Sequence, residues 1–162
     1  MSDRRQGERC VRARIGIYGA SYGGYATMAG LCFTPELYRC GINYVGVTDI
    51  DLILKEYPLP KKINDAIDAV MIADRKKDRD WIKSRSIQNN IDKVRAPVLM
   101  AYGMKDWRVP PKHGRILKRA LDRNNIPNKL IIKANEGHGY RNEDNIFEFY
   151  SEVDAFLEQH MK

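Results

Sequence analysis

The sequence predicts an α/β fold, with a parallel sheet of about four strands and helices on both of its faces. Two observations support this prediction. Short apolar segments alternate with longer segments of helical periodicity, which is typical of strands joined by right-handed crossovers. A Gly-x-Ser-x-Gly motif also stands between the first apolar segment and the first helical one. The 162 residues, 43% of them hydrophobic, suffice for one core, so we expect a basic lead over residues 1–13 and one domain over residues 14–162.

The first half of the chain is expected to supply two strands and a helix. A strand over residues 15–18 leads into the motif, and a helix over residues 22–33 follows it. Small residues in that helix permit close packing against the sheet, and Pro35 ends it. A second strand is expected over residues 41–47. The small helix residues are Ala26, Ala29 and Gly30.

In the last third of the chain, predicted strands alternate regularly with predicted helices. A strand over residues 98–102 leads to a helix over residues 111–124. A strand over residues 129–133 then leads, through a glycine-rich loop, to a final helix over residues 142–159. Apolar residues recur at helical spacing in the final helix and predict a face that packs on the sheet. They are Ile146, Phe149, Tyr150, Val153, Phe156 and Leu157.

Residues 49–90 form a long excursion between the second and third strands. An excursion of this length inside a compact domain commonly has a function. We therefore expect a cap over the site, in which Tyr57 and the residues up to Pro60 shape a pocket. The alternative is a solvated connector with two short helices.

The Gly-x-Ser-x-Gly motif predicts a nucleophile at Ser21. A sharp turn from strand to helix pushes the serine Oγ out of the sheet, and side chains at Gly19 and Gly23 are expected to collide with neighbouring backbone. The backbone N–H of Tyr22, at the positive end of the following helix, is expected to face an oxyanion that forms beside the serine. Taken alone, the motif also fits an ordinary glycine-rich loop.

A serine nucleophile needs a histidine base, and the chain offers three histidines. His138 lies in a loop after an apolar run, with a glycine on each side that lets the imidazole project. His160 lies close to the end of the sequence, and His113 follows two prolines at the start of a helix. Both are expected to be solvated surface residues. We therefore expect His138 to be the base.

The carboxylate that orients the base is expected after another strand. Asp106 follows the apolar segment of residues 98–102, so the three groups would meet at the carboxyl ends of parallel strands, where open α/β sheets place their sites. The alternatives for Asp106 are a turn aspartate and a helix N-cap. Asp144 and Glu136 compete for the orienting role, but Glu136 is too near His138 in sequence to orient it comfortably.

Three motifs carry a resemblance to a known family. The segments GASYGGYATMAG, GMKDWRVPP and EGHGY resemble the nucleophile, acid and histidine motifs of the prolyl oligopeptidase family of serine peptidases, with the acylaminoacyl-peptidase-like branch most similar. The resemblance implies a truncated α/β-hydrolase fold in which Ser21, Asp106 and His138 form the triad. It also implies that Arg108 and Val109 help to line the substrate cleft. Their alternative interpretation is a surface arginine and a core valine.

The sequence also departs from that family. Its members carry a β-propeller and several hydrolase strands before the nucleophile, whereas a short arginine-rich segment precedes it here. We therefore expect the second oxyanion donor to be missing, at a cost of about 10²–10³ in rate, and hydrolysis to be weak and less selective. The strand over residues 15–18 is expected to lie at an unpaired edge, which favours a homo-oligomer formed through that edge.

Composition narrows the set of partners. The net charge of +7 attracts polyanions, but acidic residues are interleaved with the basic ones and the chain has no recognised nucleic-acid-binding motif, so nucleic acid binding is not predicted. No apolar stretch approaches the roughly 20 residues that span a membrane. Cys10, Cys32 and Cys40 lack metal-ligand spacing and are expected to be reduced thiols. We therefore expect no metal, no cofactor and a cytoplasmic protein.

The sequence as a whole predicts a serine hydrolase that cleaves ester or peptide bonds through an acyl-enzyme. Small activated esters are favoured over amides, because amide cleavage demands more oxyanion stabilisation. Two alternatives stay open. The chain could be a catalytically weak or inert relative that acts as an interaction module, or a lactonase or thioesterase, because the same triad serves all acyl transfers.

Overall fold

The computed structural model describes residues 14–56, 72–74 and 76–162 and shows a parallel sheet of four strands. The strands follow one another across the sheet in chain order, and every neighbouring pair is parallel. The predicted α/β fold is therefore confirmed. The strands are β1 (Gly16–Ala20), β2 (Cys40–Tyr44), β3 (Val98–Gly103) and β4 (Asn128–Lys133).

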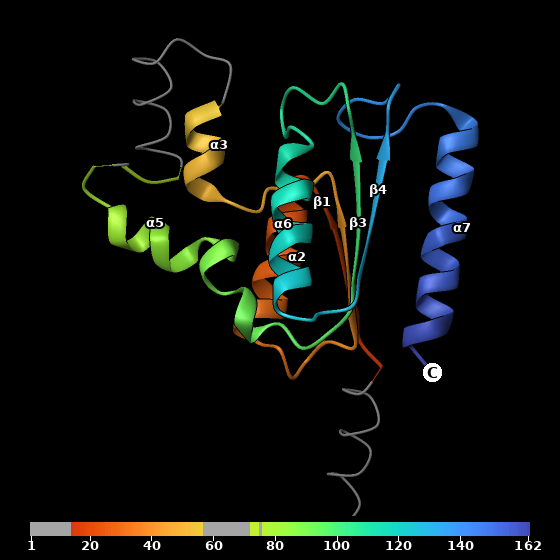
Figure 1. Cartoon of the computed structure of the whole chain (residues 1–162), viewed down its shortest axis with the longest axis horizontal. Helices are drawn as coiled ribbons and strands as arrows, with labels where there is room; N and C mark the ends of the chain where they lie inside the picture. The colour runs from red at the N-terminus through yellow and green to blue at the C-terminus, as the bar shows by residue number, and fades with distance from the viewer. Residues whose placement is uncertain (1–13, 57–71, 75) are drawn as a thin grey trace, which may run out of the picture.

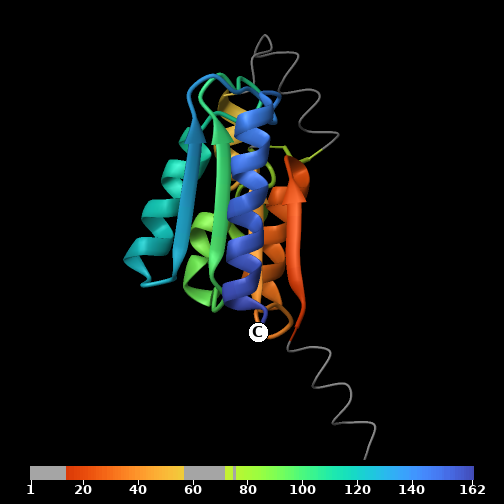
Figure 2. The same cartoon turned by 90° about the vertical axis from the view of Figure 1, so that its right-hand side faces the viewer.

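Helices cover both faces of the sheet, as predicted (Figure 1). Helices α2 (Tyr22–Phe33) and α6 (Lys112–Arg123) lie on one face. Helix α7 (Glu143–His160) returns across the other face, which Figure 2 shows from the front. Two short helices, α3 (Ile50–Glu56) and α5 (Arg79–Arg85), stand beyond α2 at the side of the sheet, and the 3₁₀ turns Ile87–Asn89 and Ile91–Lys93 lead from them to β3.

The core lies on both sides of β3, whose six residues are all buried. A continuous apolar run of this kind is typical of an interior parallel strand covered on both faces. Val98, Met100 and Tyr102 contribute to the cluster under α2 and α6. Leu99 and Ala101 contribute to the cluster under α7. Packing on both faces holds β3 in place, and this fixes the position of the loop after its carboxyl end, which contains Asp106.

Strand β1 lies at the edge of the sheet, as predicted. Its side chains are only partly covered, and Tyr18 is 49% exposed. The nucleophile turn therefore follows directly on the least covered strand of the described sheet. One of its flanks has no neighbouring strand among the described residues.

Two expectations for this region need correction. The second strand ends at Tyr44 and does not reach residue 47, because Val45 adopts a positive φ of 46° and the Gly46 N–H donates to Asn43 Oδ1 at 3.0 Å. His113 is fully buried instead of solvated, since it falls on the same face of α6 as Leu117 and Leu121. Its Nδ1 accepts a hydrogen bond from the Thr48 N–H at 3.3 Å.

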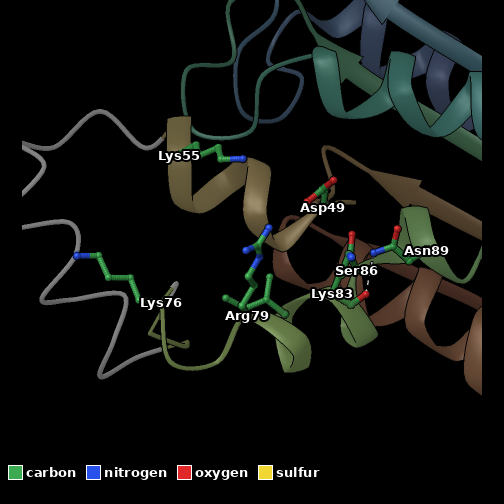
Figure 3. Close-up of a pocket in the computed structure, with 8 residues that line it drawn as sticks. Asp49, Lys55, Lys76, Arg79, Lys83, Ser86 and Asn89 are labelled. Atoms are coloured by element: carbon green, nitrogen blue, oxygen red, sulfur yellow. Dashed lines mark hydrogen bonds between the residues drawn. The ribbon is translucent and has the colours of Figure 1, made fainter.

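The excursion of residues 49–90 contains two short helices that share a small core of Ile50, Leu54, Ala73 and Ile82. A cavity of about 580 Å³ opens between α3 and α5, and Figure 3 shows the Arg79 side chain pointing from α5 toward α3. The three residues of the predicted triad are not among those that line this cavity. Residues 57–60 lie outside the described residues, as do residues 1–13, so the cap stays a prediction. In the part of the chain that the structure describes, no helix is long and apolar enough to cross a membrane.

Candidate active site

Ser21 stands at the turn between β1 and α2, as the motif predicts. Its backbone adopts φ 56° and ψ −119°, a conformation that residues with a side chain rarely hold and that costs about 1–3 kcal/mol. Two hydrogen bonds to neighbouring backbone keep it there: the Ser21 N–H donates to the Tyr44 carbonyl at 2.9 Å, and the Ser21 carbonyl accepts from the Gly24 N–H at 3.0 Å. The turn therefore has the strained strand-to-helix geometry that exposes a nucleophile.

The two glycines of the motif are not equivalent. A Cβ on Gly19 would lie 2.1 Å from the Gly23 carbonyl oxygen and 2.8 Å from Thr27 Oγ1, so only glycine fits there. A Cβ on Gly23 would meet no atom within 4 Å. The expected collision is confirmed at Gly19 and is wrong at Gly23. A requirement for glycine that the sequence did not reveal exists at Gly24, whose Cβ would lie 2.5 Å from the Gly46 Cα.

This difference yields a stability prediction for a matched pair of variants. Gly19→Ala is expected to lower the free energy of unfolding by about 3 kcal/mol or more, because the clash is with backbone that cannot move aside. Gly23→Ala is expected to leave it unchanged or raise it by up to about 1 kcal/mol, because alanine favours the helix. Urea unfolding followed by circular dichroism measures both. Equal destabilisation by the two changes would contradict the turn geometry.

The structure brings Ser21, His138 and Asp106 into one hydrogen-bonded row. His138 Nε2 lies 2.9 Å from Ser21 Oγ, and His138 Nδ1 lies 2.8 Å from Asp106 Oδ2. A carboxylate can only accept, so Nδ1 carries the proton and Nε2 is left to accept from the serine hydroxyl. The row therefore has the polarity that general-base activation of a serine requires.

Asp106 owes its position to the loop after β3. Its side chain is completely buried beside His138. Oδ1 accepts hydrogen bonds from the N–H groups of Arg108 and Val109, each at 2.9 Å, which leaves Oδ2 for the imidazole. The same side chain therefore makes the hydrogen bonds of a turn aspartate and the contact to the predicted base, and its triad role stays a prediction. Asp144, the competing carboxylate, lies exposed in the first turn of α7.

The loop that contains His138 is held by a buried carboxylate that sequence reasoning did not assign. Glu136 accepts from the N–H groups of Arg141 and Asn142 at 2.8 and 3.0 Å, and from Asn145 Nδ2 at 2.7 Å. Burial alone would raise the pKa of Glu136, but these hydrogen bonds outweigh it and lower that pKa below its ordinary value. Its carbonyl also accepts from the Lys105 N–H at 2.8 Å, which ties this loop to the loop of Asp106.

The lowered pKa of Glu136 predicts acid sensitivity. Because the folded-state pKa lies below the unfolded one, the carboxylate stabilises the fold above the unfolded value of about 4.3, and this contribution is lost as the pH falls through the folded pKa. Glu136→Gln is expected to lower the free energy of unfolding by about 1–3 kcal/mol at pH 7. Below about pH 4, the free energy of unfolding of this variant should also fall less steeply with pH than that of the unmodified chain. Urea unfolding of both proteins between pH 3 and pH 7 tests this, and parallel curves would contradict it.

Strands β2 and β3 supply supporting side chains that sequence reasoning also missed. Asn43 is buried below the nucleophile turn, where its Nδ2 donates to the Gly24 carbonyl at 3.3 Å. The Tyr102 hydroxyl donates to the Gly46 carbonyl at 2.7 Å in the same place. The Tyr44 hydroxyl accepts from the Tyr140 N–H and so holds the far end of the histidine loop. These polar side chains join three loops that the sequence keeps far apart.

The residue predicted to supply the oxyanion donor lies at a helix terminus. Tyr22 is the first residue of α2, so its N–H has no acceptor within the helix. Its side chain is 74% exposed, and its ring lies 5.7 Å from that of Tyr25. A role for this N–H in oxyanion binding stays a prediction.

A comparison with known families decides where this arrangement belongs. The model of the prolyl oligopeptidase family matches residues 5–162. The chain belongs to this family. Because the match spans nearly the whole sequence, all three motif segments lie within it, as the resemblance implied.

Individual relatives agree with this assignment. The dipeptidyl aminopeptidase BIII of Pseudoxanthomonas mexicana is 31% identical over 156 residues, which cover 90% of this chain and 22% of the relative. The acylamino-acid-releasing enzyme of Rattus norvegicus is 28% identical over 162 residues, covering 94% of this chain and 20% of the relative. A solved structure of a puromycin-hydrolyzing peptidase from Mycobacterium tuberculosis shares the fold, with a TM-score of 0.83 at 23% identity over 93% of this chain and 22% of that one. The chain therefore spans about a fifth of the relatives it matches.

The structure also places the residues for which the sequence predicts a substrate-lining role in this prolyl oligopeptidase family member, and the third histidine. Val109 is a buried core valine whose N–H supports Asp106, and Arg108 is exposed in a recess that also contains His138. A role for both in lining the substrate cleft stays a prediction. His160 is partly buried, with its ring centroid 4.7 Å from that of Phe156, and lies at the far end of α7.

The structure also bears on metal and thiol chemistry. Among the described residues, no group of three or more histidine, cysteine, aspartate or glutamate side chains is arranged to hold a metal ion. Cys32 and Cys40 are buried free thiols, and Cys10 lies outside the described residues. Burial raises the pKa of Cys32 to about 12, so this thiol stays protonated at neutral pH.

Proposed function

We propose that this chain is a serine hydrolase that transfers an acyl group to Ser21. The observation that carries the proposal is the row of two short hydrogen bonds from Ser21 Oγ through His138 to the buried Asp106. In the first step, Oγ forms a bond to the substrate carbonyl carbon and its proton passes to His138 Nε2. The carbonyl electron pair moves to oxygen, where the Tyr22 N–H stabilises the negative charge.

The second step releases the leaving group. The oxyanion electrons re-form the carbonyl, the bond to the leaving oxygen or nitrogen breaks, and His138 gives its proton to the departing atom. Water then attacks the acyl-enzyme with His138 again as base, which frees the acid and restores the Ser21 hydroxyl. Asp106 keeps its hydrogen bond to Nδ1 and stabilises the imidazolium that forms in both steps.

Ester and peptide bonds are the proposed substrate classes. The names of the relatives, an aminopeptidase and an acylamino-acid-releasing enzyme, support cleavage of peptide bonds. Small activated esters are the more accessible substrates for the chain itself, because a good leaving group needs less oxyanion stabilisation. We further propose that the protein resides in the cytoplasm, which is supported by the buried free thiols of Cys32 and Cys40.

Labelling with a fluorophosphonate probe tests the proposal directly. The purified 162-residue chain is expected to take up one probe molecule, located at Ser21 by peptide mass spectrometry, and to hydrolyse p-nitrophenyl acetate faster than buffer does. Denatured protein serves as the control for adventitious labelling. A folded chain that neither reacts with the probe nor hydrolyses the ester would reject the hydrolase and favour the interaction module.

We also propose that two copies associate through the edge of β1. One flank of β1 has no neighbouring strand among the described residues and offers backbone hydrogen-bonding groups, and Tyr18 on this strand is 49% exposed. Burial, followed by the proximity of Tyr150 on α7, raises the pKa of Tyr18 to about 12, and Tyr150 is itself 54% exposed. A two-fold axis through this edge would cover both.

Association through this edge predicts a mass of twice the 18.7 kDa of one chain. Multi-angle light scattering at micromolar concentration measures the mass. Tyr18→Lys is expected to shift the protein toward the monomer, because two like charges would face each other across the axis. Trp107→Lys, at an aromatic side chain that is 60% exposed in the loop after β3, serves as the matched control away from the edge. A monomeric unmodified chain would contradict the proposal.

A further inference from the structure

A recess of about 420 Å³ opens beside the catalytic imidazole and is separate from the cavity between α3 and α5. It is lined by His138 together with residues of the two loops that follow β3 and β4. Ser21 and Tyr22 are not among its lining residues. The recess therefore adjoins the imidazole without contacting the nucleophile or the proposed oxyanion donor.

The recess is positively charged. Lys105, Arg108 and Arg141 line it, and all three are exposed. Glu136, the one carboxylate among the described residues that line it, is 3% exposed and is occupied by hydrogen bonds from the histidine loop and α7. The charge of Arg141 also acts on Glu136, so Lys105 and Arg108 are the cations left to act on a ligand that enters the recess.

An aromatic surface adds to this charge. Trp107 is 60% exposed and also lines the recess. The Arg108 guanidinium carbon lies 5.2 Å from the centroid of its ring, a cation–π contact that limits the freedom of both side chains. A flat ligand with an anionic end matches this combination of an aromatic face and flanking cations.

The chemistry of the proposed function decides which part of the substrate reaches this place. His138 Nε2 gives its proton to the leaving atom, so the leaving group must lie within hydrogen-bonding distance of the imidazole. The remainder of the leaving group then continues past His138, on the side away from Tyr22. The recess adjoins His138 and does not contact Tyr22, so it offers space for this part of the substrate.

We propose that this recess binds the leaving-group part of the substrate and selects leaving groups that carry a carboxylate, as an acidic side chain or the carboxyl end of a short peptide does. The inference rests on the proposed function of the triad. It adds a specificity that the triad alone does not provide. The cations raise the local concentration of anionic substrates and hold them more tightly, and salt should weaken both effects.

Two isosteric esters test the proposal with the full 162-residue chain. Acetyl esters of 4-hydroxybenzoate and 4-hydroxybenzamide differ in the charge of the leaving group. At low salt, kcat/KM for the carboxylate is expected to exceed that for the amide by about tenfold, and the ratio should fall toward one at about 0.5 M salt. The double change Lys105→Glu with Arg141→Glu is expected to invert the ratio. Arg123→Glu, which places the same change at the exposed end of α6, should leave the ratio as it is.

The outcomes separate the two proposals. Turnover of both esters at equal rates would leave the hydrolase intact and overturn the selectivity. If neither ester is hydrolysed, the proposed function fails, and the recess is tested alone by nitrogen-15 NMR with 4-hydroxybenzoate as the probe. Shifts of the Trp107 indole and of the Gly137 and Gly139 amides that 4-hydroxybenzamide does not produce would support an anion-selective recess. Equal or absent shifts would overturn it.

Discussion

Ser21→Ala is expected to abolish ester turnover, with a fall in kcat of about 10⁴-fold or more, and to remove fluorophosphonate labelling altogether. The size of the fall follows from the loss of the covalent step. In Ser21→Ala no other nucleophile takes the position of Oγ, next to both the substrate carbonyl and the base. The 2.9 Å contact between Ser21 Oγ and His138 Nε2 is the only route in the described structure by which the imidazole activates a hydroxyl. Initial rates with p-nitrophenyl acetate, corrected for buffer hydrolysis, measure the loss.

A matched control separates chemistry from folding. Ser151 is exposed on α7, away from the triad, so Ser151→Ala should keep the rate and the labelling of the unmodified chain. Alanine at position 21 should also keep the helical signal in circular dichroism, because the turn is held by backbone hydrogen bonds that do not involve Oγ. Residual labelling of a folded Ser21→Ala protein would place the reactive serine elsewhere.

The parts of the site that the sequence predicts are those with local signals. The nucleophile turn is encoded within the five residues from Gly19 to Gly23, and the strand before Asp106 and the glycines around His138 are equally local. Chain order then places each group at the carboxyl end of a parallel strand, where the fold brings them together. The positive φ of Gly139, at 99°, shows why a glycine follows the histidine.

The parts that escaped prediction depend on contacts between distant segments. Asn43 and Tyr102 are separated by 59 positions, and their contact below the nucleophile turn has no signature in either segment. Glu136 is similar, since a glutamate in a polar loop is usually solvated and only the return of α7 buries it. Gly23 gave a false expectation, because the space around a helix terminus depends on what packs against it.

His113 is a different kind of error, because the sequence did hold the signal. Its spacing from Leu117 and Leu121, four and eight positions on, marks the face of α6 that packs on the sheet. The two preceding prolines indicate where the helix starts, but they do not indicate which face of the helix His113 lies on. A histidine on the apolar face of a helix is better interpreted with that face than with the loop before it.

Asp106→Asn is expected to lower kcat by about 10⁴-fold while leaving the fold intact. The asparagine oxygen can still accept the N–H groups of Arg108 and Val109, as Oδ1 does now. Its amide NH₂ then faces His138 Nδ1, which must become an acceptor, so the proton moves to Nε2. An imidazole in that tautomer cannot take a proton from Ser21, although every heavy atom keeps its place.

This prediction has a signature that simple damage to the loop would not give. Hydroxide can remove the serine proton in place of the blocked imidazole, so the residual rate of Asp106→Asn should rise with pH more steeply than that of the unmodified chain. Asp144→Asn, at the exposed carboxylate that competed for the orienting role, should retain the full rate. Equal losses in the two variants, or a fully active Asp106→Asn protein, would mean that the buried carboxylate does not set the tautomer. In that case Asp106 would be a turn residue only, with its hydrogen bonds to the Arg108 and Val109 N–H groups as its whole role.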